Sequence, residues 1–239
     1  IVWAADNGAL ICNNSWGYEY KTETDAKNST LNTAIKDAID YFIENAGCDA
    51  QGNQVGLMKG GLVTFAAGND AWRYGQPASY EAVLAVGAIG PDGRRASYST
   101  YGTGVDICAP GGKPDGFAAG AATMGYGYIM GGTSSAGRAF RCATSPACPM
   151  VSGVAALVLS VKGGPGFTAK DLWDILLNTA NSSIVPASDE IGALVDAYAA
   201  VTYGNETPVL VEGYKSYLSG REIGADESAE AVIAKPGQS

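Results

Sequence analysis

Residues 143–153 read Ala143-Thr144-Ser145-Pro146-Ala147-Cys148-Pro149-Met150-Val151-Ser152-Gly153 and open a long apolar segment. From residue 145 to residue 161 this segment is predicted to form a helix, with Val-Ser-Gly-Val-Ala-Ala-Leu-Val-Leu at its centre. A helix at a protein surface keeps one polar face, and this segment lacks one. We therefore expect a central, buried helix, around which the fold is organised.

Short apolar runs upstream of this helix indicate a sheet. Four runs are predicted to be strands: residues 9–14, 60–66, 82–89 and 105–109. Apolar residues at helical spacing predict a helix with one buried face over residues 31–46. Strands that alternate little and are separated by a helix are typical of a parallel sheet buried on both faces, so the predicted fold class is α/β.

The other segments are less regular. Residues 18–30 are polar and are predicted to be a loop. Residues 111–137 are rich in Gly and are predicted to be a loop or an irregular hairpin, and a loop of this length is more often functional than not. Thr168-Ala-Lys-Asp171 predicts a capping box that opens an amphipathic helix. Residues 193–201 are predicted to form a last short helix.

The composition of the 239 residues limits the classes of function. Lys and Arg number 15 and Asp and Glu number 24, and the resulting net charge of −9 argues against a nucleic-acid partner. No run reaches the roughly 18 apolar residues that a membrane span needs. The chain contains no His, so the commonest general base and the commonest zinc ligand are missing. Any catalysis that uses His must take it from elsewhere.

The five Cys residues include no C-x-x-C pair, so no zinc or redox site of that kind is indicated. Cys12 and Cys108 lie in apolar, strand-like runs and are interpreted as small buried residues. One disulfide that involves Cys142 or Cys148 is the alternative.

Three stretches, in this order, closely resemble the catalytic domain of the subtilisin-like serine peptidases, the subtilases. They are Phe65-Ala66-Ala67-Gly68-Asn69-Asp70, the segment from Ala96 to Gly111 with its Val105-Asp106-Ile107-Cys108-Ala109-Pro110-Gly111, and the stretch quoted first. Residues 3–17, 76–88 and 192–200 also match, so the resemblance covers roughly residues 1–201. It implies a three-layer fold with a mostly parallel sheet that is incomplete at its N-terminal side. It assigns residues 1–203 to the C-terminal part of the catalytic domain and leaves residues 204–239 as an extension.

The resemblance implies that Ser145 is the nucleophile of a serine endopeptidase and that Asn69 donates its amide to the oxyanion. A Ser at a helix N-terminus lies near backbone N–H groups and the positive end of the helix dipole, which suit a developing oxyanion. From the local sequence alone, Ser145 before Pro146 is also an ordinary N-cap. Likewise, Asn69 is also an ordinary turn residue.

The resemblance also implies a binding site for an extended peptide or protein substrate. Its walls would be Ser15-Trp16-Gly17 on one side and Ala66-Ala67-Gly68 on the other, binding the substrate backbone as an added strand. Ala67 and Gly68 leave room for the side chain that precedes the cleaved bond, although tight packing also explains small residues. Gln76-Pro77 is expected to be a cis bond, as that position often is in the family.

The chain departs from the family pattern at three positions around Ser145. Ala143 stands where Gly is usual, Pro146 where Met is usual, and Met150 where His is common. Ala143 adds a Cβ and Pro146 removes an N–H, so the two changes either narrow the oxyanion site or stiffen the turn. A second Gly-Thr-Ser triplet occurs at residues 132–134, but it lacks the Ala-x-Pro and the apolar helix, which favours Ser145 as the nucleophile.

In the subtilases, the catalytic Asp and His precede the segment that resembles Ile1-Val2-Trp3. We therefore expect that this chain, which also begins in a helix-like run, needs an upstream portion of the same protein as a partner. That portion would also supply neighbouring strands, and without it the strand that contains Leu10-Ile11-Cys12 has an open apolar edge. These 239 residues alone are expected to be neither active nor an independently stable monomer.

Three alternatives remain open at this point. The chain is part of a nicked but intact peptidase, a catalytically dead relative that binds peptides, or a sedolisin-like peptidase. Sedolisins use Glu and Asp in place of His. They also carry an Asp at the position of the oxyanion donor, where this chain has Asn69. The reaction requires no cofactor, and a structural calcium ion, frequent in the family, has no Asp-rich loop of the required spacing here. The family resemblance favours secretion.

Overall fold

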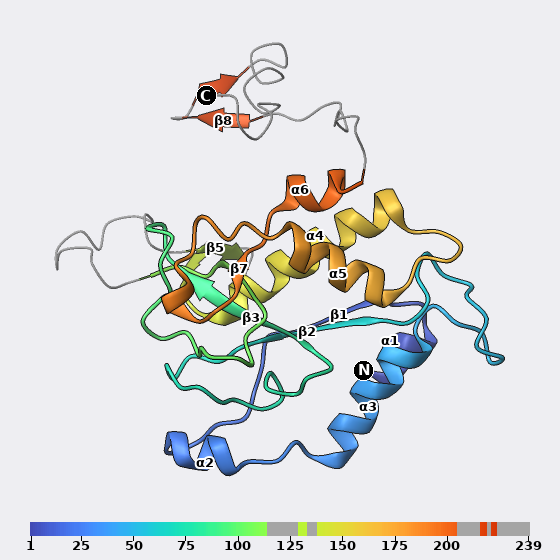
Figure 1. Cartoon of the computed structure of the whole chain (residues 1–239), viewed down its shortest axis with the longest axis horizontal. Coiled ribbons are helices and arrows are strands. Elements are labelled where there is room, and N and C mark those ends of the chain that lie inside the picture. Colours follow the sequence, from blue (N-terminus) through green and yellow to red (C-terminus); the bar gives the residue numbers. More distant parts are fainter. Residues whose placement is uncertain (114–128, 133–137, 205–215, 219–220, 224–239) are drawn as a thin grey trace. The chain divides into compact units, whose positions relative to one another are not determined.

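The computed structural model describes residues 1–113, 129–132, 138–204, 216–218 and 221–223 (Figure 1). The chain divides into two compact units, Ile1–Val201 and Thr202–Ser239. In the second unit, strands β8 (Ser216–Leu218) and β9 (Arg221–Ile223) form an antiparallel pair. The first unit contains the site.

The first unit is an α/β fold built on one sheet. Its helices are α1 (Val2–Asp6), α2 (Glu23–Asn28), α3 (Thr33–Asn45), α4 (Thr144–Lys162), α5 (Ala169–Thr179), the 3-10 helix η1 (Ala187–Asp189) and α6 (Ala197–Thr202). Its strands are β1 (Ile11–Asn14), β2 (Leu62–Ala66), β3 (Leu84–Ile89), β4 (Ile107–Pro110), β5 (Ile129–Gly132), β6 (Arg138–Arg141) and β7 (Ala193–Leu194). Five strands form a parallel sheet in the order β1-β2-β3-β4-β7, so β1 lies at an edge.

The sheet lies between two helical layers, with α1 and α3 on one face and α4 and α5 on the other (Figure 1). Successive strand residues point to opposite faces, so Leu62 and Ala66 pack in the core under α4 while Val63 and Phe65 pack under α3. All residues of β2 and β3 are buried, as a sheet covered on both sides requires. The prediction of a three-layer fold with a parallel sheet is therefore confirmed.

Helix α4 lies against the sheet where its apolar sequence predicts a central helix, but only one of its faces is buried, so the prediction of a fully buried helix is wrong. It packs against the sheet through one buried row: Ala147, Cys148, Val151, Val154, Ala155, Val158 and Leu159. Its opposite face leaves Leu157 53% exposed and Val161 43% exposed. By length and composition alone α4 is the one described helix that could cross a membrane, a criterion that the core helix of a soluble protein also meets.

Three local predictions need correction or completion. Residues 18–30 are not all loop, because Thr22 accepts a hydrogen bond from the Asp25 N–H and thereby caps the short helix α2. Residues 193–201 do not form one helix, because β7 pairs with β4 before α6 begins. Within residues 111–137 the described structure includes β5, which pairs with β6 just beyond the predicted segment, so the hairpin ends later than predicted; residues 114–128 and 133–137 lie outside the described residues. The capping box is confirmed, since Thr168 and Asp171 bond reciprocally.

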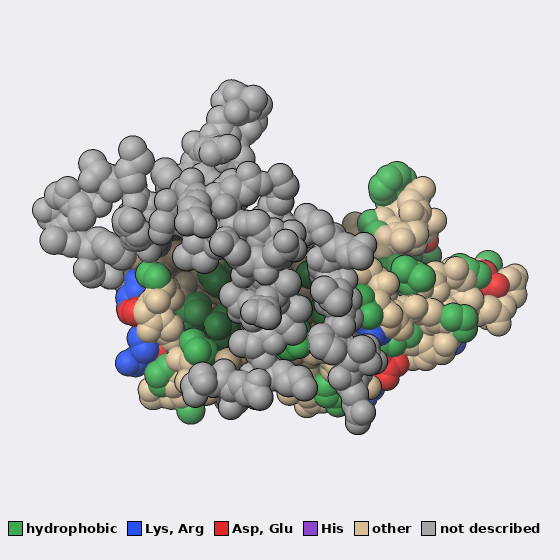
Figure 2. Space-filling view, turned by 90° about the horizontal axis from the view of Figure 1, so that it is seen from above, with side chains coloured by type: hydrophobic (Ala, Val, Ile, Leu, Met, Phe, Trp, Pro, Cys, Tyr) green, Lys and Arg blue, Asp and Glu red, His purple; other side chains and the backbone are tan. Residues whose placement is uncertain are grey.

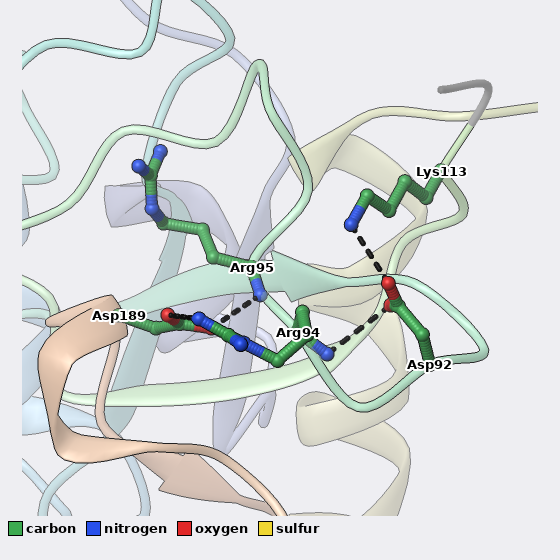
Figure 3. Close-up of polar contacts among 5 residues, drawn as sticks. All are labelled: Asp92, Arg94, Arg95, Lys113 and Asp189. Atoms are coloured by element: carbon green, nitrogen blue, oxygen red, sulfur yellow. Dashed lines mark hydrogen bonds and ion pairs between the residues drawn. The ribbon is translucent and has the colours of Figure 1, made fainter. Parts of the chain in front are cut away.

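A buried carboxylate connects the turn after β3 to η1 (Figure 3). Asp189 accepts hydrogen bonds from the guanidinium of Arg94, at 2.8 and 3.0 Å, and from the backbone N–H of Arg95 at 2.8 Å. These bonds hold the pKa of Asp189 below its ordinary value, with the Arg94 contact as the largest cause. In the same turn, Asp92 accepts from Lys113 at 2.8 Å. The two ion pairs thus hold the turn after β3 against η1 and against Lys113, the third residue after β4.

Candidate active site

The candidate site lies where the carboxyl ends of β1 and β2 meet the N-terminus of α4. Ligands of open parallel sheets bind at such carboxyl edges. A cavity of about 300 Å³ opens there. All eight residues that the sequence singled out line it: Ser15, Trp16, Gly17, Ala66, Ala67, Gly68, Asn69 and Ser145. The structure thus brings together segments that are up to 130 residues apart.

Ser145 is the second residue of α4 and is partly exposed. The N-cap of the helix is Ala143, so the interpretation of Ser145 as an N-cap is wrong. The backbone N–H of Ser145 donates to no described residue, as expected in the first turn of a helix. Its side-chain Oγ makes one long contact, 3.4 Å to the carbonyl oxygen of Ser15. Among the described residues, the hydroxyl of Ser145 therefore has one weak partner and its N–H has none, and Ser145 belongs to the lining of the cavity.

Ser15 and Ser145 make a second contact. The hydroxyl of Ser15 donates to the carbonyl oxygen of Ser145 at 2.9 Å. In a regular helix that carbonyl would accept from the N–H four residues later, but this residue is Pro149, which has none. Pro149 thus leaves the Ser145 carbonyl available, and Ser15 satisfies it from the opposite wall.

Asn69 caps α4 from outside the helix. Its Oδ1 accepts from the backbone N–H of Thr144 at 2.8 Å and from the Thr144 hydroxyl at 3.0 Å. Because a backbone N–H can only donate, the side-chain atom that faces it must be the oxygen, and this fixes the orientation of the amide. The Nδ2 donor of Asn69 bonds to no described residue and is available to the cavity.

The wall formed by residues 66–68 depends on a glycine. Gly68 has a φ of +115°, and a Cβ built on it would lie 2.8 Å from the Oγ1 of Thr100. Its carbonyl accepts from the Thr100 N–H at 3.0 Å, and its N–H donates to the Thr144 hydroxyl at 3.2 Å. Gly68 is thus required by both backbone conformation and close packing.

On the opposite wall, Trp16 is held edge-on against Phe65, with ring centroids 5.2 Å apart. Its indole N–H donates to Asn14 Oδ1 at 3.1 Å. Next to it, the Tyr18 N–H donates to the carbonyl of Gln76 at 2.9 Å, and Gly17 passes close to the same carbonyl. The segment after β1 is therefore held at Trp16 and at Tyr18.

Sequence reasoning missed part of the lining. The further residues are Tyr18, Glu19, Tyr20, Asp70, Tyr74, Gly75, Gln76, Thr100 and Thr144. The one available signal was the expected cis bond between Gln76 and Pro77, which the structure confirms. That bond belongs to the segment that closes the cavity, where a Cβ on Gly75 would lie 3.2 Å from the Ala67 carbonyl.

The three departures from the family pattern are accommodated without disturbing this geometry. Ala143 has extended backbone, with φ −174° and ψ 170°, which any residue adopts. Pro146 lies in the first helical turn, where an N–H would have no partner within the helix. Met150, which belongs to α4, is partly buried and packs against the margin of the core between α4 and the sheet.

Burial disfavours the thiolate form of two buried cysteines. Burial raises the pKa of Cys148, one turn after Ser145, to about 11 and that of Cys108 to about 12. The interpretation of Cys108 as a small buried residue is confirmed, whereas Cys12 is only partly buried. No disulfide occurs within the described part of the chain, so the disulfide alternative is not supported there.

The described residues include no group of three or more His, Cys, Asp or Glu side chains that could hold a metal ion. On the face shown in Figure 2, Lys and Arg side chains lie beside Asp and Glu at the left margin, and its described part carries no broad patch of one charge.

The chain combines a three-layer α/β fold with a Ser at the start of its central helix. Comparison with known proteins identifies the family to which a chain with these two features belongs. The model of the subtilase family matches residues 1–206. The chain belongs to the subtilase family.

Individual relatives agree with this assignment. A thermophilic serine proteinase of Bacillus sp. (strain AK1) is 35% identical over 204 residues, which are 85% of this chain and 40% of that protein. An extracellular basic protease of Dichelobacter nodosus is 40% identical over 148 residues, 59% of this chain and 23% of that protein. The chain thus spans less than half the length of these relatives.

Solved structures show the same fold. The prenylagaramide maturation protease PagA superposes with a TM-score of 0.60 at 27% identity and covers 83% of this chain, which in turn covers 63% of PagA. The epidermin leader peptide processing serine protease of Staphylococcus aureus gives a TM-score of 0.64 at 23% identity, over 87% of this chain and 54% of that one.

Proposed function

We propose that this chain carries the nucleophile and the oxyanion site of a serine endopeptidase. The observation that carries the proposal is the convergence of three groups on one cavity. They are the Ser145 hydroxyl, the unpaired Ser145 N–H and the Nδ2 of Asn69, whose orientation Thr144 fixes. Donors placed where negative charge develops are a major source of rate enhancement in acyl transfer.

In the proposed reaction, Ser145 Oγ attacks the carbonyl carbon of the scissile peptide bond and its proton passes to a general base. The carbonyl oxygen becomes an oxyanion that accepts from the Ser145 N–H and from Asn69 Nδ2. The C–N bond then breaks, and the leaving amine takes the proton from the base. Water subsequently attacks the acyl-enzyme, which releases the acid and restores the hydroxyl. These reaction steps require no cofactor.

The walls of the cavity suit an extended peptide. Ser15-Trp16-Gly17 and Ala66-Ala67-Gly68 flank the nucleophile with backbone groups, and an added strand uses main-chain hydrogen bonds of this kind. The cavity between the walls receives the substrate side chain before the cleaved bond. Relatives named extracellular protease and halolysin support secretion of the whole protein.

The general base and its orienting carboxylate come, in this proposal, from a portion of the protein outside these residues. The chain has no His, and Ser145 Oγ contacts a carbonyl oxygen rather than a base. In the described part of the chain, β1 pairs with β2 alone, and the face of α4 that points away from the sheet leaves Leu157 and Val161 exposed. An additional segment that extends the sheet at β1 and covers these side chains would stabilise the fold as well as complete the triad.

The absence of a base among these residues also favours a second candidate, a module that binds peptides without cleaving them. Hydrolysis of a protein substrate such as casein by the complete protein separates the two. The proposal predicts turnover that Ser145→Ala abolishes, and no turnover by the 239-residue chain alone. Binding of peptides without turnover by the complete protein would support the module instead.

A further inference from the structure

The backbone of Ser145 depends on a bond from another segment. Pro149 deprives the Ser145 carbonyl of its donor four residues later in the helix, and the Ser145 N–H bonds to no described residue. Among the described residues, the bond from the Ser15 hydroxyl at 2.9 Å is the one hydrogen bond that reaches this backbone from outside α4. Whatever fixes the Ser15 hydroxyl therefore also fixes Ser145.

Asn13, on the edge strand β1, holds the Ser15 hydroxyl. Its Nδ2 lies 3.3 Å from Ser15 Oγ. The Ser15 hydroxyl gives its one proton to the Ser145 carbonyl, because a carbonyl oxygen can only accept. Ser15 Oγ must therefore accept from Asn13, and the atom of Asn13 that faces it must be the nitrogen. These two bonds fix the orientation of the Asn13 amide.

Helix α4 holds the other end of this amide. Since Nδ2 faces Ser15, Oδ1 faces the Ser152 hydroxyl at 3.1 Å and can only accept from it. The Ser152 hydroxyl also lies 3.2 Å from the Cys148 carbonyl, but in a helix that carbonyl accepts the N–H of Ser152. The proton of the Ser152 hydroxyl is therefore assigned to Asn13.

The bonds continue from Ser152 into the core. With its proton given to Asn13, Ser152 must accept from the buried hydroxyl of Thr64 on β2, at 2.9 Å. Thr64 in turn can only accept from the buried thiol of Cys148, at 3.3 Å. All the protons then point one way, from the core to the carbonyl of Ser145. Hydrogen bonds that are aligned in this manner strengthen one another.

We propose that Asn13 is a positioning residue of the active site. The proposal rests on the endopeptidase function proposed above. Asn13 is not among the residues that line the cavity, so it acts through Ser15, whose hydroxyl it connects to the buried side of α4. Without the Asn13 donor, the Ser15 hydroxyl turns more freely and the Ser145 peptide group is held less firmly. A small displacement of a nucleophile slows the reaction strongly, even where substrate binding is unchanged.

The test uses the complete protein and a fluorogenic peptide that spans a bond the protein cleaves in casein. Asn13→Asp keeps the acceptor for Ser152 but places a carboxylate oxygen against Ser15 Oγ. At pH 8 we expect kcat to fall about tenfold while KM changes by less than about twofold, because the cavity walls are intact. Asn28→Asp, the same exchange at an exposed position of α2, should change neither constant.

Acidification distinguishes positioning from general damage to the fold. A protonated Asp has one O–H donor and one carbonyl acceptor, so it restores the bonds to both Ser15 and Ser152. The kcat of Asn13→Asp relative to that of the wild type should therefore rise about fivefold from pH 8 to about pH 4, where nearly half of an ordinary Asp is protonated. The ratio removes the pH dependence that the two proteins share.

A double variant identifies the route of the effect. Ser15→Ala removes the hydroxyl through which Asn13 acts, so adding Asn13→Asp to it should lower kcat no further. Three results overturn the inference alone: unchanged kcat in Asn13→Asp, an equal loss in the Ser15→Ala background, or a ratio that stays constant on acidification. If the complete wild-type protein cleaves no bond in casein, the endopeptidase proposal fails, and the inference fails with it.

Discussion

The hydroxyl of Ser15 donates to the backbone carbonyl of Ser145 at 2.9 Å and joins the two walls of the site across 130 residues. The bond exists because Pro149 removes the helical N–H that this carbonyl would otherwise accept. It fixes the position of Ser145, the proposed nucleophile, relative to the end of β1.

Ser15→Ala should lower the free energy of unfolding by about 1 kcal/mol, because it leaves the Ser145 carbonyl without a donor. Pro149→Ala restores a helical N–H that the Ser145 carbonyl can accept. In a protein that carries Pro149→Ala, Ser15→Ala should therefore lower the free energy of unfolding by less. Urea denaturation of the four combinations measures this coupling. Ser160→Ala, at an exposed position of α4, is the control, and equal Ser15→Ala losses with and without Pro149 would contradict the account.

Asn69→Asp separates the observed capping role of Asn69 from its proposed role as an oxyanion donor. The variant keeps an oxygen for the Thr144 N–H, and a negative charge at a helix N-terminus is stabilising, so the melting temperature should hold or rise. Without Nδ2, kcat should fall on the order of 10²–10³-fold, the loss seen when a subtilisin loses one such donor. A protein that melts normally and retains full kcat would exclude Asn69 from the oxyanion site.

Gly68→Ala and Gly153→Ala should have opposite effects on stability. At Gly68 the new methyl group meets Thr100 Oγ1 at 2.8 Å and the backbone has positive φ, so a loss of at least about 1 kcal/mol is expected. At Gly153, inside α4, no atom lies within 4 Å, so up to about 1 kcal/mol should be gained from helix propensity. Thermal unfolding compares the two, and similar effects at both positions would show that the wall at Gly68 is not tightly packed.

The Asp189–Arg94 pair should contribute to acid sensitivity. The pKa of Asp189 is lowered in the folded state. The stability that the pair provides is therefore present above the ordinary pKa of Asp, about 3.9, and is lost as the pH falls through the pKa that Asp189 has in the folded state. Asp189→Asn should therefore cost about 2 kcal/mol at pH 7 and progressively less below about pH 4. Urea midpoints across this range test the sign. Asp37→Asn, at an exposed position of α3, is the control, and a cost that grows on acidification would contradict the assignment.

Much of this architecture was predictable because it depends on long apolar patterns. The fully apolar strands and the central helix α4 follow from burial on both faces of a sheet, which leaves few alternatives. The short helix α2 was missed because it buries only Ala26 and is held by its Thr22 cap, a signal too local for periodicity. The strand β7 was missed because two residues pair only once β4 is in place beside them.

The site was predictable as a set of segments but not as a network. Motif resemblance placed Ser145 and Asn69 in one cavity, yet nothing in the sequence indicates that Asn69 caps α4 through Thr144. Nor does it indicate that Gln76 is left with an unpaired oxygen. Both features arise from contacts between distant segments, which no local pattern contains.

The most direct test of the central claim is labelling of the complete protein with a fluorophosphonate probe, followed by mass spectrometry of the modified peptide. Our account predicts a single phosphonyl adduct on Ser145, which disappears in Ser145→Ala. It also predicts slower labelling of Asn69→Asp. No adduct, or an adduct that persists in Ser145→Ala at Ser134 of the second Gly-Thr-Ser triplet or at the adjacent Ser135, would contradict the assignment of Ser145 as the nucleophile.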